Sequence, residues 1–113
     1  MKTDVIINRD ALYALRELSG ESVNCCVTSP PYYGLRDYGL DAQIGREDTP
    51  EQYIDRLVEV FRELRRVLKD DGTFWLNIAD TYCGTGMKAG CKQKDLIGIP
   101  WLLAFALRSD GWY

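Results

Sequence analysis

The residues best suited to chemistry in this sequence form one short run, Ser29-Pro30-Pro31-Tyr32-Tyr33. Two adjacent prolines can neither extend a sheet ladder nor enter the interior of a helix, so they hold the chain stiffly in a loop. The Ser29 hydroxyl and the Pro30 carbonyl can accept hydrogen bonds, and the tyrosine rings can stack on a flat molecule. These groups predict a site that holds a flat heterocycle. The alternative is a simple Pro-Pro turn beside a buried tyrosine.

The elements before this run must place it at the edge of a sheet. Residues 23–28 are almost continuously apolar, which is typical of a strand covered on both faces. The β-branched run Val5-Ile6-Ile7 predicts an earlier strand, and a helical pattern follows over residues 11–18. Asp10 precedes that pattern, where it can cap the helix. Because open α/β sheets bind ligands at the carboxyl ends of their strands, we expect Asp10 and Ser29 at the same edge.

The segment after the prolines predicts a loop and then a long helix. Residues 34–48 are polar and lack periodicity, which predicts a mobile surface loop. Thr49, Pro50 and Gln52 predict a helix start with a capping box. The apolar stripe that follows predicts a helix as far as Asp71-Gly72.

The rest of the chain predicts one more strand and one more helix. Residues 73–78 have the composition of a strand, and residues 79–94 that of a glycine-rich loop. Pro100 opens an apolar helix that ends before Gly111. Strand and helix thus alternate along the chain, which predicts a parallel α/β sheet with about three strands and right-handed crossovers.

The composition fits one small globular domain. The chain has 113 residues, of which 46% are hydrophobic and 27% are charged, and its net charge is −3. This acidic balance provides no bulk attraction to phosphate backbones, so positive charge for nucleic acid must be local. The N-terminus lacks the pattern of a signal peptide, and the apolar run over residues 97–107 is too short to span a bilayer. We therefore expect a cytoplasmic protein without a membrane contact.

The cysteines and the absence of histidine limit the possible chemistry. The four cysteines lack the paired C-x-x-C spacing of zinc sites, and the sequence contains no histidine to complete a mixed site. We therefore expect no metal site, and we expect reduced thiols at Cys25, Cys26, Cys83 and Cys91. The lack of histidine also excludes Ser-His-Asp triads, Cys-His nucleophiles and zinc-dependent base deaminases.

The run Ser29-Pro30-Pro31-Tyr32 resembles the catalytic motif of DNA methyltransferases that modify exocyclic amino groups. The flanking pairs Val27-Thr28 and Tyr33-Gly34 resemble the form common among N4-cytosine enzymes. The resemblance extends over nearly all of the chain, from Asp10 to the closing Gly111-Trp112-Tyr113. It implies a Rossmann-like fold, S-adenosylmethionine as the cofactor, and double-stranded DNA with a flipped target base as the substrate.

The resemblance also implies roles for the residues of the motif. Ser29 and Pro30 would accept hydrogen bonds from the target amino group, and Pro31 would fix their geometry. Tyr32 would stack on the flipped base. We expect Tyr33 to line the same pocket.

Two further residues have both a functional and a plainer interpretation. In the family, an acidic residue at the place of Asp10 contacts the adenine of the cofactor, and it can cap a helix at the same time. Arg36 can contact DNA near the flipped base, or it can be a solvated loop charge. Both interpretations stay open for each residue.

The identity of the target base depends mainly on Ser29. Adenine-N6 enzymes of the family more often carry Asp or Asn at this place, so Ser29 favours transfer to N4 of cytosine by a restriction-modification or phage-borne enzyme. Transfer to N6 of adenine is the alternative. An alternative from another class is a non-catalytic module that binds a partner or single-stranded nucleic acid through its Pro-Pro-Tyr loop.

The catalytic domain of the family contains more than this sequence supplies. Its sheet is larger, and both its glycine-rich cofactor motif and its target-recognition region are missing here. We therefore interpret residues 1–113 as the N-terminal part of a methyltransferase catalytic domain, with an incomplete Rossmann-like fold. We expect this part to be inactive alone, and its exposed sheet edges could pair with a second copy as a homodimer.

Overall fold

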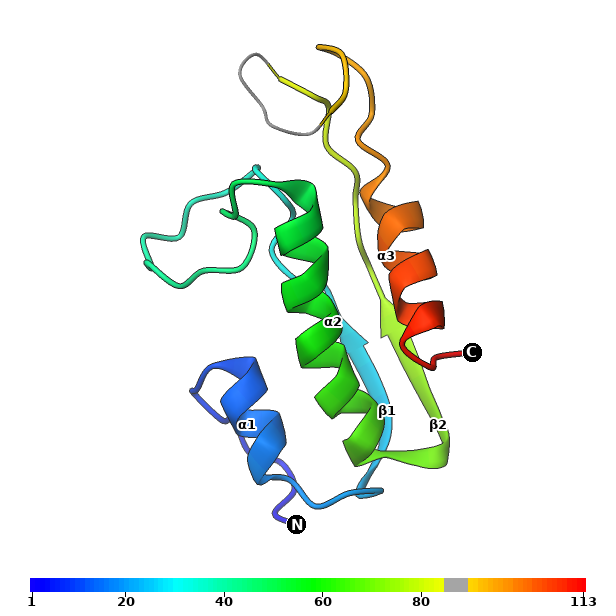
Figure 1. The fold of residues 1–113 in the computed structure, drawn as a ribbon. Coiled ribbons are helices and arrows are strands. Elements are labelled where there is room, and N and C mark those ends of the chain that lie inside the picture. The colour runs from blue at the N-terminus through cyan, green and yellow to red at the C-terminus, as the bar shows by residue number, and fades with distance from the viewer. Residues whose placement is uncertain (85–89) are drawn as a thin grey trace.

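The computed structural model describes residues 1–84 and 90–113, which form a small α/β unit (Figure 1). Its elements are α1 (Ala11–Glu17), β1 (Val23–Thr28), α2 (Pro50–Val67), β2 (Leu68–Leu76) and α3 (Ile99–Ser109). The two strands of its sheet run parallel, with Cys25 opposite Thr73 and Thr28 opposite Leu76. The predicted α/β class and parallel pairing are therefore confirmed, and α2 lies in the crossover between the strands.

Helix α2 forms the centre of the core. The Thr49 hydroxyl accepts a hydrogen bond from the Gln52 N–H, and the Gln52 side chain accepts one from the Thr49 N–H, so the predicted capping box is present. One stripe of the helix is buried, and α1 and α3 pack on either side of it (Figure 1). The buried residues of this stripe are Tyr53, Ile54, Leu57, Val60, Phe61, Leu64 and Val67.

The two faces of the sheet differ in their cover. On the face toward α2, the rings of Phe74 and Phe61 lie 4.8 Å apart between their centroids. On the opposite face, Val27 and Trp75 are 77% and 63% exposed. Within the described residues, the prediction that residues 23–28 are covered on both faces therefore holds for one face only.

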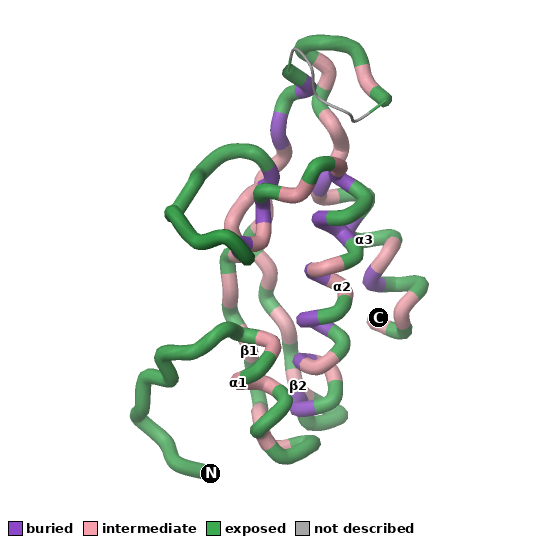
Figure 2. The backbone as a smooth tube through the Cα atoms, turned by 60° about the vertical axis from the view of Figure 1, so that its left-hand side comes forward, coloured by how far each residue is buried: buried purple, intermediate pink, exposed green. Residues whose placement is uncertain are grey.

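The predicted strand at Val5-Ile6-Ile7 is absent. Ile6 is 96% exposed, and Figure 2 shows the N-terminal segment running outside the rest of the chain. A strand needs a partner strand for its backbone groups, and among the described residues the sheet consists of β1 and β2 alone. The sheet therefore has two strands among the described residues rather than the predicted three.

The boundary between α2 and β2 lies earlier than predicted. The pattern predicts a helix as far as Gly72, whereas α2 ends at Val67 and β2 begins at the next residue. The final turn accepts hydrogen bonds from the loop before β1: the Glu21 N–H donates to the Arg66 carbonyl at 3.1 Å, and the Ser22 N–H donates to the Val67 carbonyl at 2.8 Å. These long-range bonds satisfy the helix end, and local periodicity does not reveal them.

Cys83 and Cys91 form a disulfide, with their Cα atoms 6.2 Å apart, so the expectation of reduced thiols is wrong for this pair. The chain returns on itself here, because the Lys94 N–H donates to the Cys83 carbonyl at 2.8 Å. This return brings the two thiols together, and it has no signature in the cysteine spacing. Cys25 and Cys26 are free, as expected.

The predicted glycine-rich loop over residues 79–94 is described in part. The described part of residues 79–94 contains no helix and makes one isolated bridge, between Tyr82 and Leu96, while residues 85–89 lie outside the described residues. Across 1–84 and 90–113, no helix has both the length and the apolar character needed to cross a bilayer.

Candidate functional site

The Pro-Pro loop lies at the carboxyl end of β1, as the sequence predicts. The Asn77 N–H donates a hydrogen bond of 2.9 Å to the Thr28 carbonyl, and the prolines then take the chain away from the sheet. Beyond this point lies an open pocket of about 290 Å³, near the lower end of the volumes typical of small-ligand sites. Its lining residues are Ser29, Pro30, Pro31, Tyr32, Leu35, Arg36 and Tyr38.

Two hydroxyl groups meet in the wall of this pocket. The Ser29 Oγ and the Tyr32 OH lie 3.2 Å apart, within hydrogen-bonding distance. Ser29 is exposed and Tyr32 is half-buried. Both oxygens can therefore accept a hydrogen bond from a donor in the pocket, such as an amino group.

A buried tyrosine fixes the backbone of the loop from behind. The Tyr53 hydroxyl donates a hydrogen bond of 2.7 Å to the Pro31 carbonyl, and the Tyr53 side chain is fully buried. Burial raises the pKa of Tyr53, with a smaller contribution from the nearby Glu47 carboxylate. The hydroxyl therefore stays protonated and remains a donor across the physiological pH range.

Tyr33 points into the core and is not among the residues that line this pocket. Its ring lies 5.4 Å from that of Tyr53 between centroids, and its hydroxyl donates to the Asp48 carbonyl at 3.2 Å. The Tyr33 carbonyl in turn accepts a hydrogen bond of 2.7 Å from the Thr81 hydroxyl. In this structure Tyr33 therefore anchors the end of the Pro-Pro loop to the core.

The loop over residues 34–48 has neither helix nor strand, as predicted, but several bonds tie it down. The Gly34 N–H donates to the Gly45 carbonyl at 2.8 Å. The Arg56 guanidinium on α2 contacts the Glu47 carboxylate at 2.6 Å and donates to the Ala42 carbonyl at 2.8 Å. The second half of the loop is thus attached to α2. Leu35, Arg36 and Tyr38, in its first half, form the outer side of the pocket.

Asp10 caps α1, as predicted. Its carboxylate accepts hydrogen bonds from the N–H groups of Leu12 at 3.0 Å and Tyr13 at 3.4 Å. Helix α1 lies beside the half of α2 that is farther from the 34–48 loop (Figure 1), and Asp10 does not line the pocket. Because residues 5–7 form no strand, the argument that placed Asp10 and Ser29 at one sheet edge loses its basis.

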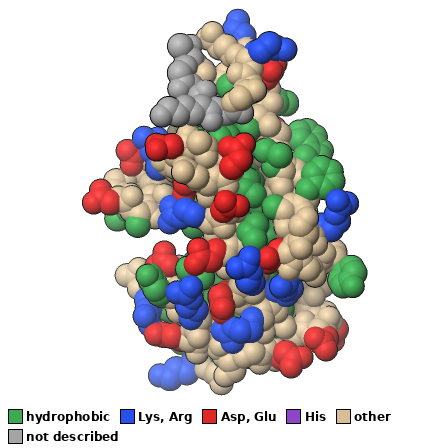
Figure 3. Space-filling model, viewed as in Figure 1, with side chains coloured by type: hydrophobic (Ala, Val, Ile, Leu, Met, Phe, Trp, Pro, Cys, Tyr) green, Lys and Arg blue, Asp and Glu red, His purple; other side chains and the backbone are tan. Residues whose placement is uncertain are grey.

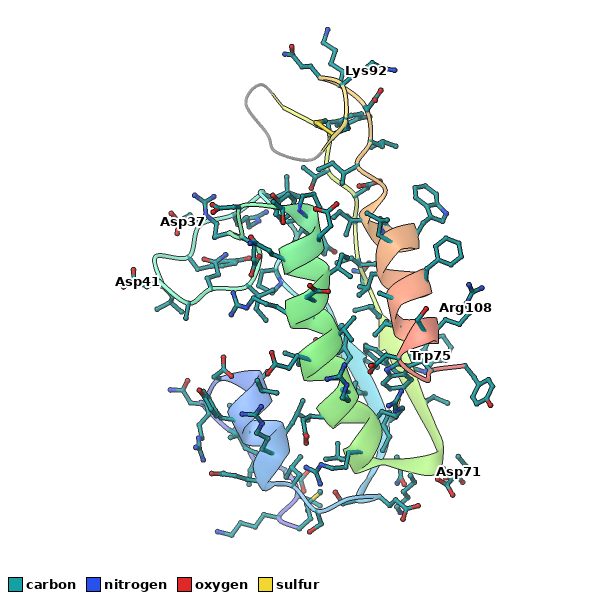
Figure 4. All side chains as sticks on the ribbon, in the orientation of Figure 1. Asp37, Asp41, Asp71, Trp75, Lys92 and Arg108 are labelled. Atoms are coloured by element: carbon teal, nitrogen blue, oxygen red, sulfur yellow. A yellow bond between two sulfur atoms is a disulfide. The ribbon has the colours of Figure 1, made fainter. Side chains whose placement is uncertain are left out.

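The charges around the pocket are mixed in sign. On the face shown in Figure 3, Lys and Arg side chains lie among Asp and Glu side chains over α1 and α2. Asp37 and Asp41 project outward from the 34–48 loop (Figure 4), whereas Arg36 lines the pocket. Arg36 is thus the one cationic residue among those that line the pocket. No cluster of three or more His, Cys, Asp or Glu side chains suited to a metal occurs in the described parts of the chain.

Three residues with structural roles have little or no signal in the sequence: Tyr53 holds the Pro-Pro loop, Gln43 bonds to the backbone of Arg36 and Tyr38, and Asp80 caps α3. Tyr53 belongs to the apolar stripe of α2, which marks it as core but not as a donor to the loop. Gln43 lies in a polar segment without periodicity and has no distinguishing signal. Asp80 accepts hydrogen bonds from the Gly98 N–H at 3.0 Å and from the Ile99 N–H at 3.1 Å. Because Gly98 has no side chain with which to cap α3, a cap from elsewhere could have been suspected.

Comparison with known proteins identifies similar chains. A family model described as DNA methylase matches residues 23–113. The type II methyltransferase M.Cfr9I of Citrobacter freundii is 52% identical over 92% of this chain and 41% of its own length. The type II methyltransferase M.SmaI of Serratia marcescens is 50% identical over 96% of this chain and 44% of its own. The DNA adenine methyltransferase YhdJ of Escherichia coli strain K12 is 35% identical over 63% of this chain and 23% of its own.

The chain spans less than half the length of these relatives. No solved structure matches it.

Proposed function

This chain belongs to the DNA methylase family, whose members methylate exocyclic amino groups of DNA bases, and from that premise we propose a function for the full-length protein that contains it. We propose that the full-length protein is a site-specific DNA methyltransferase and that residues 1–113 are the N-terminal part of its catalytic domain. The observation that carries this proposal is the pair of hydroxyl groups on Ser29 and Tyr32, 3.2 Å apart in the wall of an open pocket.

The chemistry of the pocket suits an amino group attached to an aromatic ring. The lone pair of such a nitrogen is delocalised into the ring, so the nitrogen must be turned toward tetrahedral geometry before it can attack. The Ser29 Oγ and the Pro30 carbonyl can accept its two N–H bonds and hold it in that orientation. Type II DNA methyltransferases of this family use S-adenosylmethionine, which supplies an electrophilic methyl group. With the cofactor bound, the bond between this methyl group and the sulfonium sulfur would break as the C–N bond forms, S-adenosylhomocysteine would leave, and the amino nitrogen would lose one proton to water.

The wall of the pocket suits a base turned out of the DNA helix. Pro31 stiffens the loop, and the Tyr32 ring can stack on the base with a contribution of about 1–3 kcal/mol. Arg36 can meet a phosphate near the base, since it lines the same pocket. The substrate we propose is therefore double-stranded DNA with a flipped target base.

The residues of this chain fit the reacting amino group better than they fit the cofactor. On the family resemblance, we propose the Asp10 carboxylate for contact with the adenine of S-adenosylmethionine, although residues 5–7 form no strand and Asp10 does not line the pocket. It already accepts two backbone N–H bonds, and its remaining lone pairs can accept a bond from the cofactor. The glycine-rich motif for the methionine part of the cofactor belongs to the rest of the protein in this proposal, so we expect residues 1–113 to be inactive alone.

A larger Rossmann-like sheet in the full-length protein agrees with the surfaces left open here. Val27 and Trp75 on the bare sheet face and Ile6 in the N-terminal segment are exposed. Trp101 and Phe105 on the outer side of α3 are 61% and 55% exposed, and hydrophobic side chains gather over α3 in Figure 3. Apolar surface of this kind supports the proposal that further parts of the protein cover it.

We propose N4 of cytosine as the methylated atom, in a restriction-modification context, because Ser29 occupies the first position of the motif. Transfer to N6 of adenine is the second candidate, which the similarity to a protein named as a DNA adenine methyltransferase supports. The experiment that separates them uses the purified full-length protein with S-adenosylmethionine and unmethylated DNA. Mass spectrometry of the digested DNA should detect N4-methylcytosine. N6-methyladenine would establish the second candidate, and the absence of any methylated nucleoside would refute both.

A further inference from the structure

The outer wall of the pocket comes from the 34–48 loop. Leu35, Arg36 and Tyr38 line the pocket opposite the Pro-Pro run. Tyr38 is 59% exposed, and its segment has no ladder or helical bonds to hold it. A wall of this kind keeps one shape only if other groups bind its backbone.

Gln43 provides those bonds. Its side-chain amide donates a hydrogen bond of 2.7 Å to the Arg36 carbonyl. The carbonyl oxygen of the same amide accepts a hydrogen bond of 2.7 Å from the Tyr38 N–H. Gln43 is buried, so one side chain holds the backbone of two wall residues from inside the loop.

Gln43 is itself held by α2. The Arg56 guanidinium donates a hydrogen bond of 3.2 Å to the backbone carbonyl of Gln43 and contacts the Glu47 carboxylate at 2.6 Å. Glu47 also accepts a hydrogen bond of 2.8 Å from the Gly45 N–H. A continuous set of polar contacts therefore runs from a rigid helix through Gln43 to the outer wall of the pocket.

We propose that Gln43 is a positioning residue that keeps the outer wall preformed for the nucleotide carrying the target base. In this arrangement Tyr38 offers a ring to the base or sugar and Arg36 offers a cation to the adjacent phosphate. Gln43 touches neither the nucleotide nor the reacting atoms, and it acts through the backbone of these two residues. The inference rests on the proposed function, because the wall has this use only if the pocket receives a nucleotide.

The test uses the full-length protein with Gln43→Met, which keeps the length of the side chain and removes both hydrogen bonds. Gln52→Met is the matched control, because the Gln52 side chain accepts a hydrogen bond from the Thr49 N–H at the helix cap and lies outside the pocket wall. Two quantities are measured: hydrogen exchange at the Tyr38 amide without DNA, and the steady-state kcat and KM for DNA. Gln43→Glu is a second variant, since it retains an acceptor for the Tyr38 N–H but replaces the donor to Arg36 with a carboxylate oxygen that faces the Arg36 carbonyl.

For Gln43→Met we expect the Tyr38 amide to lose its protection and the KM for DNA to rise about tenfold, with kcat changed by less than about threefold. Gln43→Glu should keep more of the protection at the Tyr38 amide than Gln43→Met does and should also raise KM, and Gln52→Met should change neither quantity. Unchanged exchange at Tyr38, or lost protection without a rise in KM, would overturn the proposal. If the wild-type protein methylates no DNA, the proposed function fails, while the exchange measurement still decides whether Gln43 holds the wall.

Discussion

The buried hydroxyl of Tyr53 donates a hydrogen bond of 2.7 Å to the carbonyl of Pro31. This single bond joins the first turn of α2 to the stiffest part of the pocket. It explains how a loop outside the sheet can present the Ser29 hydroxyl in a fixed place. The helix therefore supplies both the core of the fold and the support of the site.

The first prediction concerns this bond. Tyr53→Phe leaves the Pro31 carbonyl without its partner and should lower the free energy of unfolding by about 1 kcal/mol. Because the loop can then shift, kcat of the full-length protein should fall about tenfold at temperatures where the variant is folded. Tyr13→Phe, at an exposed position on α1, is the control and should leave both quantities unchanged. A Tyr53→Phe variant with wild-type stability and wild-type kcat would show that the Tyr53 hydroxyl does not support the site.

The second prediction compares two glycines with positive φ angles. Gly45 has φ of +109°, and a Cβ there would lie 3.0 Å from the Tyr32 carbonyl, whereas Gly39 has φ of +80° and open space around it. Alanine is strained at both positions, but only Gly45→Ala also pushes against the pocket. Urea unfolding should therefore show Gly45→Ala to be about 1 kcal/mol less stable than Gly39→Ala. Equal stability of the two variants would show that the loop accommodates the Cβ beside the Tyr32 carbonyl without a loss of stability.

The third prediction tests the core. Leu57 is 1% exposed in the buried stripe of α2, and Leu57→Ala should lower the free energy of unfolding by about 2–5 kcal/mol. Leu40→Ala removes the same atoms from a side chain that is 70% exposed, and it should change stability by less than about 0.5 kcal/mol. The comparison is made by denaturant titration. Similar losses for both variants would contradict the position of α2 at the centre of the core.

The fourth prediction concerns pH. The Arg62 guanidinium donates a hydrogen bond of 2.7 Å to the Asp110 carboxylate, and this bond lowers the pKa of Asp110 below its usual range. A carboxyl whose pKa is lower in the folded state stabilises the protein above its unfolded pKa, about 4, and loses this effect as the pH falls through the folded pKa.

The corresponding measurement is the melting temperature of wild type and Asp110→Asn at pH 7 and pH 3. The wild type should melt at the higher temperature at pH 7, and the difference should shrink at pH 3. A difference that stays constant between the two pH values would show that the ion pair does not stabilise the link between α2 and α3.

Local chemistry was enough to predict part of this fold. The capping box at Thr49, the helix N-cap at Asp10 and the loop imposed by Pro30 and Pro31 all depend on residues close in the sequence. For the same reason, the place of Ser29 at the carboxyl end of β1 was predictable.

The other features depend on contacts between distant residues. Val5-Ile6-Ile7 has the composition of a strand but has no partner strand in the described part of the chain, and composition alone does not reveal that. The hydrogen bonds between the Gln43 side chain and the backbone of Arg36 and Tyr38 form because the 34–48 loop closes on itself, and no periodic pattern in the sequence indicates that closure. Tyr33 was expected in the pocket, yet its ring packs on Tyr53, and the sequence does not show whether a tyrosine after the Pro-Pro run faces the pocket or the core.

The central claim is that the Ser29 hydroxyl orients the amino group of a flipped base. The most direct measurement compares wild-type and Ser29→Ala full-length protein for turnover and for DNA affinity. Loss of one preorganised acceptor should lower kcat by about a hundredfold, while the dissociation constant for DNA changes by less than about threefold. Equal turnover of the two proteins would contradict the claim and remove Ser29 from the mechanism.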